Sequence, residues 1–374
     1  MDRYIKKVTD VRVDRDIHRT LSGWPLLVIS GFIGGLSGIL ALLLSRWMAR
    51  YGGLDSPDKH GISNVRASRL GGVLIVSYVL FSIAYHYISA EEIIVAGTSL
   101  WVLALAGLFF SIGLFEDIKG TLSARRRLLI MLGAVAALLA LNPDMLIKPI
   151  GVPMVDWFLE NPWLAAPVSL LSLVFLPNAF NTADGANGLV AGISLITILA
   201  LGSAGLGDLN LLLGLASISC LIFLIYNVMT AQFYLGDGGA YFLGALVGGA
   251  LISASNAGVL PVWYLLSLIF YPSADFLWSI CRRISRGQSP MASDELNLHN
   301  LVYARLRRLT GWQAGSNTMT GIGIAVGFAG LPYLAWLLAG DRVEWLWVFL
   351  LQLLTYLGLW FLLRPKLAAK SVGG

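Results

Sequence analysis

Four polar stretches interrupt an otherwise apolar chain, and each combines acids, amides or bases with glycine or a short turn. They are GLFEDIKGTLSARRRL (113–128), NAFNTADGANGL (178–189), AQFYLGDGGAYFLG (231–244) and SDELNLHNLVYARLRR (293–308). Carboxylate and amide oxygens are the hard ligands that Mg²⁺ and Mn²⁺ prefer, and neighbouring Lys and Arg side chains suit phosphate groups. This combination predicts phosphoryl transfer assisted by a divalent cation.

The acids of the first three stretches lie next to glycines or short turns, which are typical of helix ends. They are Glu116, Asp117, Asp184 and Asp237. The nearby bases are Lys119, Arg125, Arg126, Arg127, Arg282 and Arg283. A single acid at a helix end can simply be solvated, and three arginines can be ordinary membrane anchors. The joint occurrence of the four stretches favours one shared site, because ionisable groups near membrane depth are costly and usually functional.

The composition places these stretches in a membrane protein. Of the 374 residues, 57% are hydrophobic and only 13% are charged, whereas a soluble domain has about 25% charged residues. The mean hydropathy is +0.76. Helices and closed barrels are the structures that satisfy backbone groups in lipid, and the sequence lacks the short alternating segments of a barrel. We therefore predict an all-α fold, a polytopic integral membrane helical bundle of ten or eleven transmembrane helices.

Eleven apolar segments are expected to span the membrane. Their approximate bounds are 24–48, 71–89, 93–115, 128–141, 163–180, 188–204, 209–229, 240–257, 260–281, 316–340 and 344–363. Ten is the alternative, because the fourth segment is short and glycines interrupt the sixth. The first segment has no small-residue cleavage site and is expected to be an anchor. We expect a single polytopic membrane domain at 24–363, a charged N-terminal tail at 1–23 and a C-terminal tail at 364–374.

Basic residues are distributed unequally between the two sets of loops. Eighteen of the twenty-six Lys and Arg residues lie in one set, which comprises 46–70, 116–127, 181–187, 230–239, 282–311 and the C-terminal tail. The other set contains only Lys148 and Arg342. The positive-inside rule therefore predicts that the first set, with all four polar stretches, faces the cytoplasm. The N-terminal tail opposes this, since eleven spans would place its six basic residues outside.

At these residues the chain resembles the polyprenyl-phosphate N-acetylhexosamine-1-phosphate transferases (glycosyltransferase family 4), over about residues 55–310. NAFNTADGANGL matches the family pattern N-x-x-N-x-x-D-G-x-x-G-L at every fixed position. The resemblance implies that this stretch binds the nucleotide sugar and, through Asn181, the metal. The substrate-binding residues that it implies are Asn178, Asn181, Asp184 and Asn187.

The stretch YLGDGGAYFLG resembles the family's M-G-D-x-G-S-x-x-L-G, with Leu235 and Ala240 in place of the usual Met and Ser. These replacements spare the acid. The resemblance therefore implies that Asp237 binds Mg²⁺, or Mn²⁺ in its place, together with Asp117 or Asn181.

FEDIKGTLSARRRL resembles the family's D-D motif followed by L-S-x-R-x-K-L, with Glu116 in place of the first aspartate and Arg127 in place of the lysine. It implies that Glu116 and Asp117 are catalytic. The resemblance gives the same role to Asp184 of NAFNTADGANGL. Lys119 and Arg127 are expected to bind phosphate, although arginine presents a planar fork rather than a point charge.

SDELNLHNLVYARL resembles the family's D-x-x-H-L-H-H-x-L, in which Asn297 and Asn300 stand where histidines are usual. The implied role is recognition of the sugar nucleotide by Asp294, His299 and Asn300. The change disfavours the muropeptide branch, whose counterpart is a histidine triplet. SNVRASRLGGV (63–73) resembles H-x-x-P-T-P-R-x-G-G-I through Arg69 and the glycine pair, and adds Arg69 to the substrate-binding residues.

The resemblance implies transfer of an N-acetylhexosamine-1-phosphate from a UDP-sugar to polyprenyl (undecaprenyl) phosphate, which gives polyprenyl-diphosphate-sugar and UMP. Such a reaction initiates a cell-surface polysaccharide such as O-antigen, at a bacterial inner membrane, with the site facing the cytoplasm. The expected partners are the UDP-N-acetyl sugar and the lipid, and no nucleic acid. The sequence leaves open whether the lipid phosphate attacks directly or after a covalent carboxyl-phosphate intermediate, and whether the protein is a homodimer.

Two other classes of protein remain as alternatives. A secondary transporter of a phosphorylated or nucleotide solute should carry its ionisable residues near the bilayer midplane in repeated halves, whereas here they lie at one face. A catalytically inactive scaffold of the same fold is favoured by the departures at Glu116, Asn297 and Asn300.

Overall fold

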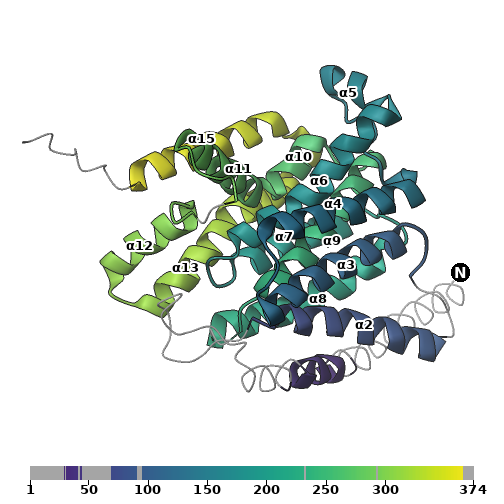
Figure 1. Ribbon diagram of the computed structural model, residues 1–374, viewed down its shortest axis with the longest axis horizontal. Helices are drawn as coiled ribbons and strands as arrows, with labels where there is room; N and C mark the ends of the chain where they lie inside the picture. The colour runs from purple at the N-terminus through teal and green to yellow at the C-terminus, as the bar shows by residue number, and fades with distance from the viewer. Residues whose placement is uncertain are drawn as a thin grey trace, which may run out of the picture.

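The computed structural model describes residues 29, 31–40, 43, 69–90, 95–230, 233–291 and 294–364. Within these ranges the chain forms helices and no β-strand (Figure 1). The predicted fold class, an all-helical polytopic membrane protein, is confirmed. The expected N-terminal tail, most of the first predicted span and the segment 63–68 lie outside the described residues.

The helices follow one another through short connections. They are α2 (Gly71–Ala90), α3 (Gly97–Lys119), α4 (Ala124–Leu141), α5 (Pro153–Leu159), α6 (Pro162–Ala183), α7 (Leu189–Gly202), α8 (Leu209–Thr230), α9 (Gly236–Asn256), α10 (Val262–Leu268), α11 (Phe270–Ser285), α12 (Leu298–Thr310), α13 (Gln313–Ala325), α14 (Leu331–Ala339) and α15 (Trp345–Leu363). A π-helical segment, Val326–Gly330, joins α13 to α14.

Seven helical segments of the described chain are long and apolar enough to cross a membrane, or eight if α10 and α11, which are bent by 74°, form one broken span. The ten or eleven spans predicted from the sequence include the segment 24–48, most of which lies outside the described residues and is not counted here. Two of the predicted spans are helices that do not meet the requirement. α4 begins with three arginines, and α7 has 14 residues, about 21 Å at 1.5 Å per residue, against a hydrocarbon core of about 30 Å.

Helix α9 lies at the centre of the bundle, and α3 and α6 pack against it (Figure 1). Small residues allow the backbones to approach closely. A Cβ atom on Gly113 of α3 would lie 2.5 Å from the backbone of Asp237, and one on Gly72 of α2 would lie 2.4 Å from that of Gly239. The start of α9 is therefore held between the start of α2 and the last turns of α3.

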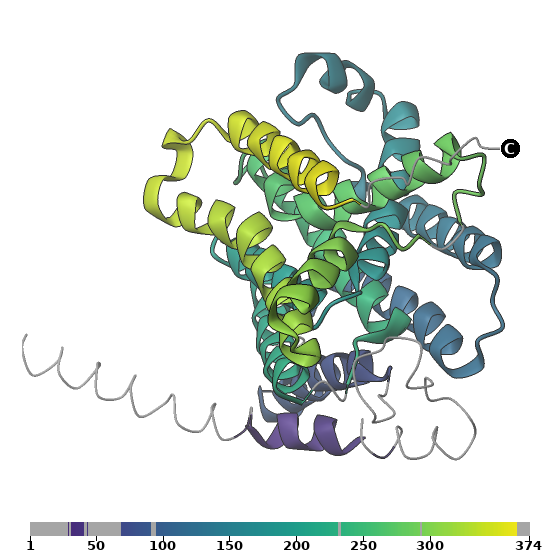
Figure 2. The ribbon, with the colours of Figure 1, turned by 90° about the vertical axis from the view of Figure 1, so that its left-hand side faces the viewer.

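The C-terminal helices α12, α13 and α15 gather on the left of Figure 1, the side that faces the viewer in Figure 2. Helix α12 packs against both α13 and α15. The indole Nε1 of Trp360 on α15 donates a hydrogen bond of 2.8 Å to the carbonyl oxygen of Leu296. This contact holds the connection between α11 and α12 against the bundle.

Candidate functional site

A polar pocket of about 200 Å³ opens where the α6–α7 connection meets the start of α9. The segment before α2, together with α8 and α13, completes its wall. The polar residues that line it are Arg69, Asn181, Asp184, Asn187, Asn227, Tyr234, Asp237 and Asn317. Three of the four polar stretches contribute to this region, since Asp117 lies directly behind the start of α9. The fourth, 293–308, contributes no lining residue.

Asp117, in the last turn of α3, caps the N-terminus of α9. Its Oδ1 accepts a hydrogen bond of 3.1 Å from the backbone N–H of Asp237, and its Oδ2 accepts one of 2.8 Å from that of Gly238. The first N–H groups of a helix have no partner within the helix, and no local side chain caps α9. Asp117 therefore fixes the first turn of α9, and with it the position of Asp237.

Asp237 and Arg127 form an ion pair through Oδ2 and Nη1. Both side chains are largely buried, with relative exposures of 24% and 20%. Arg127 lies in the first turn of α4, whose N-cap Ser123 accepts a hydrogen bond from the backbone N–H of Arg126. The guanidinium group of Arg127 thus neutralises the carboxylate for which the sequence predicted a metal.

Glu116 and Lys119 lie outside the pocket. The Oε2 atom of Glu116 accepts a hydrogen bond of 2.9 Å from the backbone N–H of Leu122. Glu116 therefore orders the connection that leads from α3 to α4 and positions Arg127 indirectly. Lys119, the last residue of α3, is exposed.

The α6–α7 connection is held by two amides that sequence analysis missed. The backbone N–H of Asn187 donates to Oδ1 of Asn317 on α13, at 2.6 Å, and the backbone N–H of Gly188 donates to Oδ1 of Asn227 on α8, at 2.8 Å. Gly188 has φ = +78°, which favours glycine. A single buried asparagine within an apolar helix is the signal that could have pointed to Asn227 and Asn317.

The side chains of this connection differ in their environments. Asn187 is buried, and its Nδ2 has no hydrogen-bond partner among the described residues. Asn181 donates from Nδ2 to the Tyr241 hydroxyl at 3.3 Å. Asn178, by contrast, donates to the carbonyl oxygen of Val174 at 2.8 Å and does not line the pocket. Asn181 and Asn187 therefore line the pocket, whereas Asn178 does not.

Asp184 follows the last residue of α6 and lines the pocket. Part of its surface is accessible, but protein atoms surround it. Burial raises the pKa of Asp184 to about 7, and the negative charge of Asp237 contributes to the increase. At neutral pH this carboxyl group is poised to accept or release a proton.

The residues of the 293–308 stretch are engaged with α11 rather than with the pocket. Asp294 Oδ2 accepts hydrogen bonds from Arg282 Nε at 3.0 Å and from Ser279 Oγ at 2.8 Å. These bonds, with one from the Leu296 backbone, outweigh burial and lower the pKa of Asp294. Asn297 Oδ1 also accepts from Arg282, at 3.1 Å.

His299 is 2% exposed and lies behind the pocket wall. A Cβ atom on Gly185 would lie 2.2 Å from its Nε2, so the imidazole ring packs against the connection that contains Asp184. Burial lowers the pKa of His299, and the charge of Asp275 opposes this effect. Asn300, the next residue of α12, is partly buried and does not line the pocket.

The described residues contain no group of three or more His, Cys, Asp or Glu side chains that could hold a metal ion. Mg²⁺ is usually bound by one or two carboxylates together with water and substrate phosphates. Asp237 and the amide oxygen of Asn181 line the same pocket. The residues present therefore fit a magnesium site that a phosphate substrate completes, rather than a cage built by protein alone.

A second cavity, of about 710 Å³, is almost entirely apolar and lies between α6, α9, α10, α11 and α15. Its lining residues include Leu171, Phe175, Leu251, Leu265, Trp278 and Phe349. At Trp278 and Cys281 it reaches the last turns of α11, next to Arg282. The cavity can accommodate an apolar chain beside the polar end of the bundle.

Comparison with known proteins matches residues 98–255 to the model of glycosyl transferase family 4. A probable undecaprenyl-phosphate N-acetylglucosaminyl 1-phosphate transferase of Bacillus subtilis (strain 168) is 28% identical over 285 residues, which cover 74% of this chain and 77% of that protein. The decaprenyl-phosphate N-acetylglucosaminephosphotransferase of Mycolicibacterium smegmatis is 28% identical over 324 residues, with 78% and 79% covered. A phospho-N-acetylmuramoyl-pentapeptide-transferase of Moorella thermoacetica is 37% identical over 139 residues, with 36% and 43% covered. The matched segment, over which the chain is similar to glycosyl transferase family 4, contains three of the four polar stretches, from Asp117 through Asp184 to Asp237.

Proposed function

We propose that this membrane protein transfers an N-acetylhexosamine-1-phosphate from a UDP-sugar to a polyprenyl phosphate, with UMP as the second product. The observation that carries the proposal is the convergence of Asp237, Asp184 and Arg69 on one polar pocket, with Arg127 beside them. The names of two relatives, which describe N-acetylglucosamine phosphate transfer to a polyprenyl phosphate, support it. N-acetylglucosamine is therefore the first sugar to test.

The pocket of about 200 Å³ is smaller than the 300–1,000 Å³ typical of a small-molecule site. We infer that it holds the diphosphate and nearby groups while the rest of the donor extends into the opening. Asn187 offers an unpartnered Nδ2 donor to the nucleotide sugar. The apolar cavity beside α11 would hold part of the polyprenyl chain.

In the proposed reaction an oxygen of the lipid phosphate attacks the β-phosphorus of the donor, and the bond to the UMP oxygen breaks. Asp237 and the amide oxygen of Asn181 would hold Mg²⁺, which would neutralise the diphosphate and make UMP a better leaving group. Arg127 and Arg69 reduce the repulsion between the two anionic substrates. Asp184, whose pKa is about 7, takes the proton of the lipid phosphate.

Direct attack accounts better for the geometry than a covalent carboxyl-phosphate intermediate at Asp117. Both carboxylate oxygens of Asp117 accept hydrogen bonds from the start of α9. A nucleophilic attack by Asp117 would have to break this cap. Glu116 is committed to the α3–α4 connection in a similar way.

We further propose that the protein lies in a bacterial inner membrane with the pocket toward the cytoplasm, where it initiates a cell-surface polysaccharide. The excess of Lys and Arg in the loops at this end supports the orientation. Asn297 and Asn300, in place of histidines, favour a polysaccharide other than peptidoglycan. A transporter is disfavoured because the polar pocket lies at helix ends and not in the middle of broken helices.

The test is UMP release by purified protein with polyprenyl phosphate, Mg²⁺ and a panel of UDP-N-acetylhexosamines, next to Asp237→Asn. The matched control is Asp208→Asn, because Asp208 is also a carboxylate that lies near the end of a helix, but it bonds to the Ser99 backbone N–H at the other end of α3. Release that needs lipid and Mg²⁺, and that only Asp237→Asn abolishes, supports the transferase. No release with any sugar, from protein that still binds lipid, favours the inactive scaffold or the transporter.

A further inference from the structure

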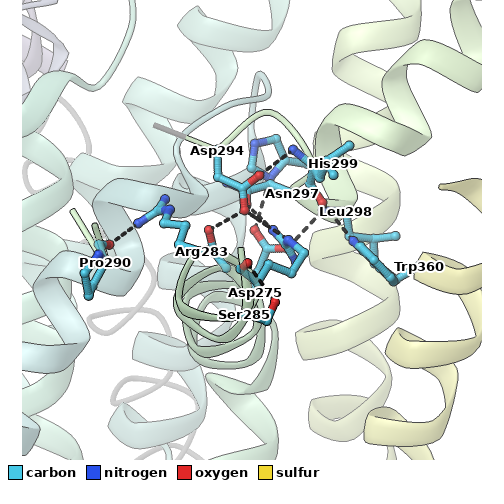
Figure 3. Close-up of polar contacts among 12 residues, drawn as sticks. Asp275, Arg283, Ser285, Pro290, Asp294, Asn297, Leu298, His299 and Trp360 are labelled. Carbon is cyan, nitrogen blue, oxygen red and sulfur yellow. Dashed lines mark hydrogen bonds and ion pairs between the residues drawn. The ribbon is translucent and has the colours of Figure 1, made fainter. Parts of the chain in front are cut away.

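Asp275 of α11 is a fully buried carboxylate that does not line the polar pocket. Figure 3 shows it among its neighbours, which include Leu298 and His299. Its Oδ1 accepts hydrogen bonds from the backbone N–H of Leu298, at 2.9 Å, and from the hydroxyl of Tyr356, at 2.8 Å. Its Oδ2 has no hydrogen bond among the described residues. This oxygen lies 3.7 Å from Nδ1 of His299. A buried carboxylate is costly unless it is paired. His299 is the group that can pair with Oδ2 of Asp275.

Two residues of α11, one helical turn apart, hold the imidazole ring. The Tyr271 hydroxyl accepts a hydrogen bond of 3.1 Å from the backbone N–H of His299 and lies 3.0 Å from its Nδ1. The charge of Asp275 favours a proton on the same nitrogen. Tyr271 and Asp275 thus fix both the start of α12 and the orientation of the ring.

The opposite edge of the ring contacts the pocket wall. A Cβ atom on Gly185 would lie 2.2 Å from Nε2 of His299 and 2.6 Å from Cδ2. Gly185 itself lines the pocket, directly after Asp184. The ring therefore lies between Asp275 and the turn that carries Asp184.

We propose that Asp275 is a positioning residue, which acts through His299 to hold the Asp184–Gly185 turn in the geometry that binds the nucleotide sugar. The chain of contacts runs from the carboxylate to Nδ1, through the ring, and from Nε2 to Gly185. The assignment of the nucleotide sugar rests on the proposed function, whereas the placement of the turn does not.

The effect of Asp275 Oδ2 on His299 can be tested separately from the part that Asp275 plays in holding α12. The segment before α12 has its own anchors, since Asp294 pairs with Arg282 and Trp360 bonds to Leu296. The hydrogen bonds that Asp275 accepts from the Leu298 backbone N–H, at the start of α12, and from the Tyr356 hydroxyl of α15 both use Oδ1. Asp275→Asn can keep Oδ1 as an acceptor but removes the charge that faces His299.

The experiment compares the wild type with Asp275→Asn, His299→Gln and the double variant, with Asp208→Asn as the carboxylate-to-amide control. The first measurement is hydrogen–deuterium exchange of the amides at 183–190, which needs no substrate. The second is the KM for UDP-N-acetylglucosamine and, separately, for polyprenyl phosphate.

We expect Asp275→Asn to accelerate exchange at 183–190 at least fivefold and to raise the KM for the nucleotide sugar about tenfold, with the KM for the lipid unchanged. The double variant should resemble His299→Gln alone, because residues that act in series are not additive. Asp208→Asn should change neither quantity. A variant that only reduced the amount of folded protein would lower the apparent kcat and leave both KM values unchanged.

The proposal is overturned if exchange at 183–190 in Asp275→Asn equals that of the wild type, or if the effects of the two single variants multiply. A wild type that releases no UMP with any donor refutes the proposed function. The exchange measurement still decides in that case whether Asp275 positions the turn.

Discussion

The carboxylate of Asp117 accepts hydrogen bonds from the backbone N–H groups of Asp237 and Gly238, so one acid of the site determines where another lies. The two acids are 120 residues apart in the sequence. The bond joins the last turns of α3 to the first turn of α9. It makes the position of Asp237 depend on helix packing and not on its own loop.

We expect Asp117→Asn to lower the free energy of unfolding by about 0.5–2 kcal/mol, the usual effect of losing a helix cap. An amide can accept only one of the two bonds through oxygen. Asp237 should shift with the freed turn, so that UMP release falls at least tenfold. Thermal unfolding and the UMP assay measure the two effects. Equal activity of Asp117→Asn and wild type would contradict this role for the cap.

We expect Gly113→Ala to separate α3 from α9. Its Cβ would lie 2.5 Å from the backbone of Asp237, and such overpacking typically costs about 1–3 kcal/mol. Gly107→Ala, in the same helix, meets nothing within 4 Å and should be neutral or stabilising. Thermal unfolding of the two variants in one detergent compares them. The close approach would be refuted if both variants had the stability of the wild type.

We expect Arg127→Ala to strengthen binding of divalent cations while it reduces transfer. The guanidinium group pairs with Asp237, and its removal frees the carboxylate but also removes a charge that attracts phosphate. Electron paramagnetic resonance of bound Mn²⁺ measures the affinity without any turnover. Weaker Mn²⁺ binding than in the wild type would show that Arg127 does not compete with the cation.

The pKa of Asp184 gives a pH dependence of stability. Since this pKa rises from 3.8 to about 7 on folding, the folded state binds more protons between these values. The stability contributed by the protonated group is therefore complete below pH 3.8 and is lost as the pH rises to 7. In EDTA, Asp184→Asn should be about 1–3 kcal/mol more stable than wild type at pH 8, after allowance for partial solvation. The difference should shrink by pH 5.

Thermal unfolding at pH 5, 6, 7 and 8 tests this expectation, with Asp208→Asn as the control. A difference between Asp184→Asn and wild type that does not change with pH would contradict the raised pKa. The variant should be inactive in the UMP assay at every pH, because an amide cannot take the proton that the proposed reaction transfers to Asp184.

The sequence by itself determined the membrane class, the helical fold and the location of most of the pocket. Apolar runs about as long as a bilayer is thick are typical of membrane-spanning helices, and a motif such as N-x-x-N-x-x-D-G keeps its asparagines and aspartate within one connection. Asp184, Asn181 and Asn187, which lie within this connection or at its start, all line the pocket. The number of spans is harder to predict from the sequence, because hydropathy does not reveal that α7 is short or that α10 and α11 are bent relative to each other.

Only the tertiary structure decided which polar residues face the pocket and which hold it in place. Asp117 and Asp237 are both acids at helix ends, yet one is used by backbone N–H groups of another helix and the other faces the pocket. His299 resembles a binding residue in its motif but lies behind Gly185. Asn227 and Asn317 stand out in the sequence only as single asparagines within their helices, and Asp275 carries no local pattern. Their roles come from partners far away in the sequence, and a buried polar group is recognised only when those partners are known.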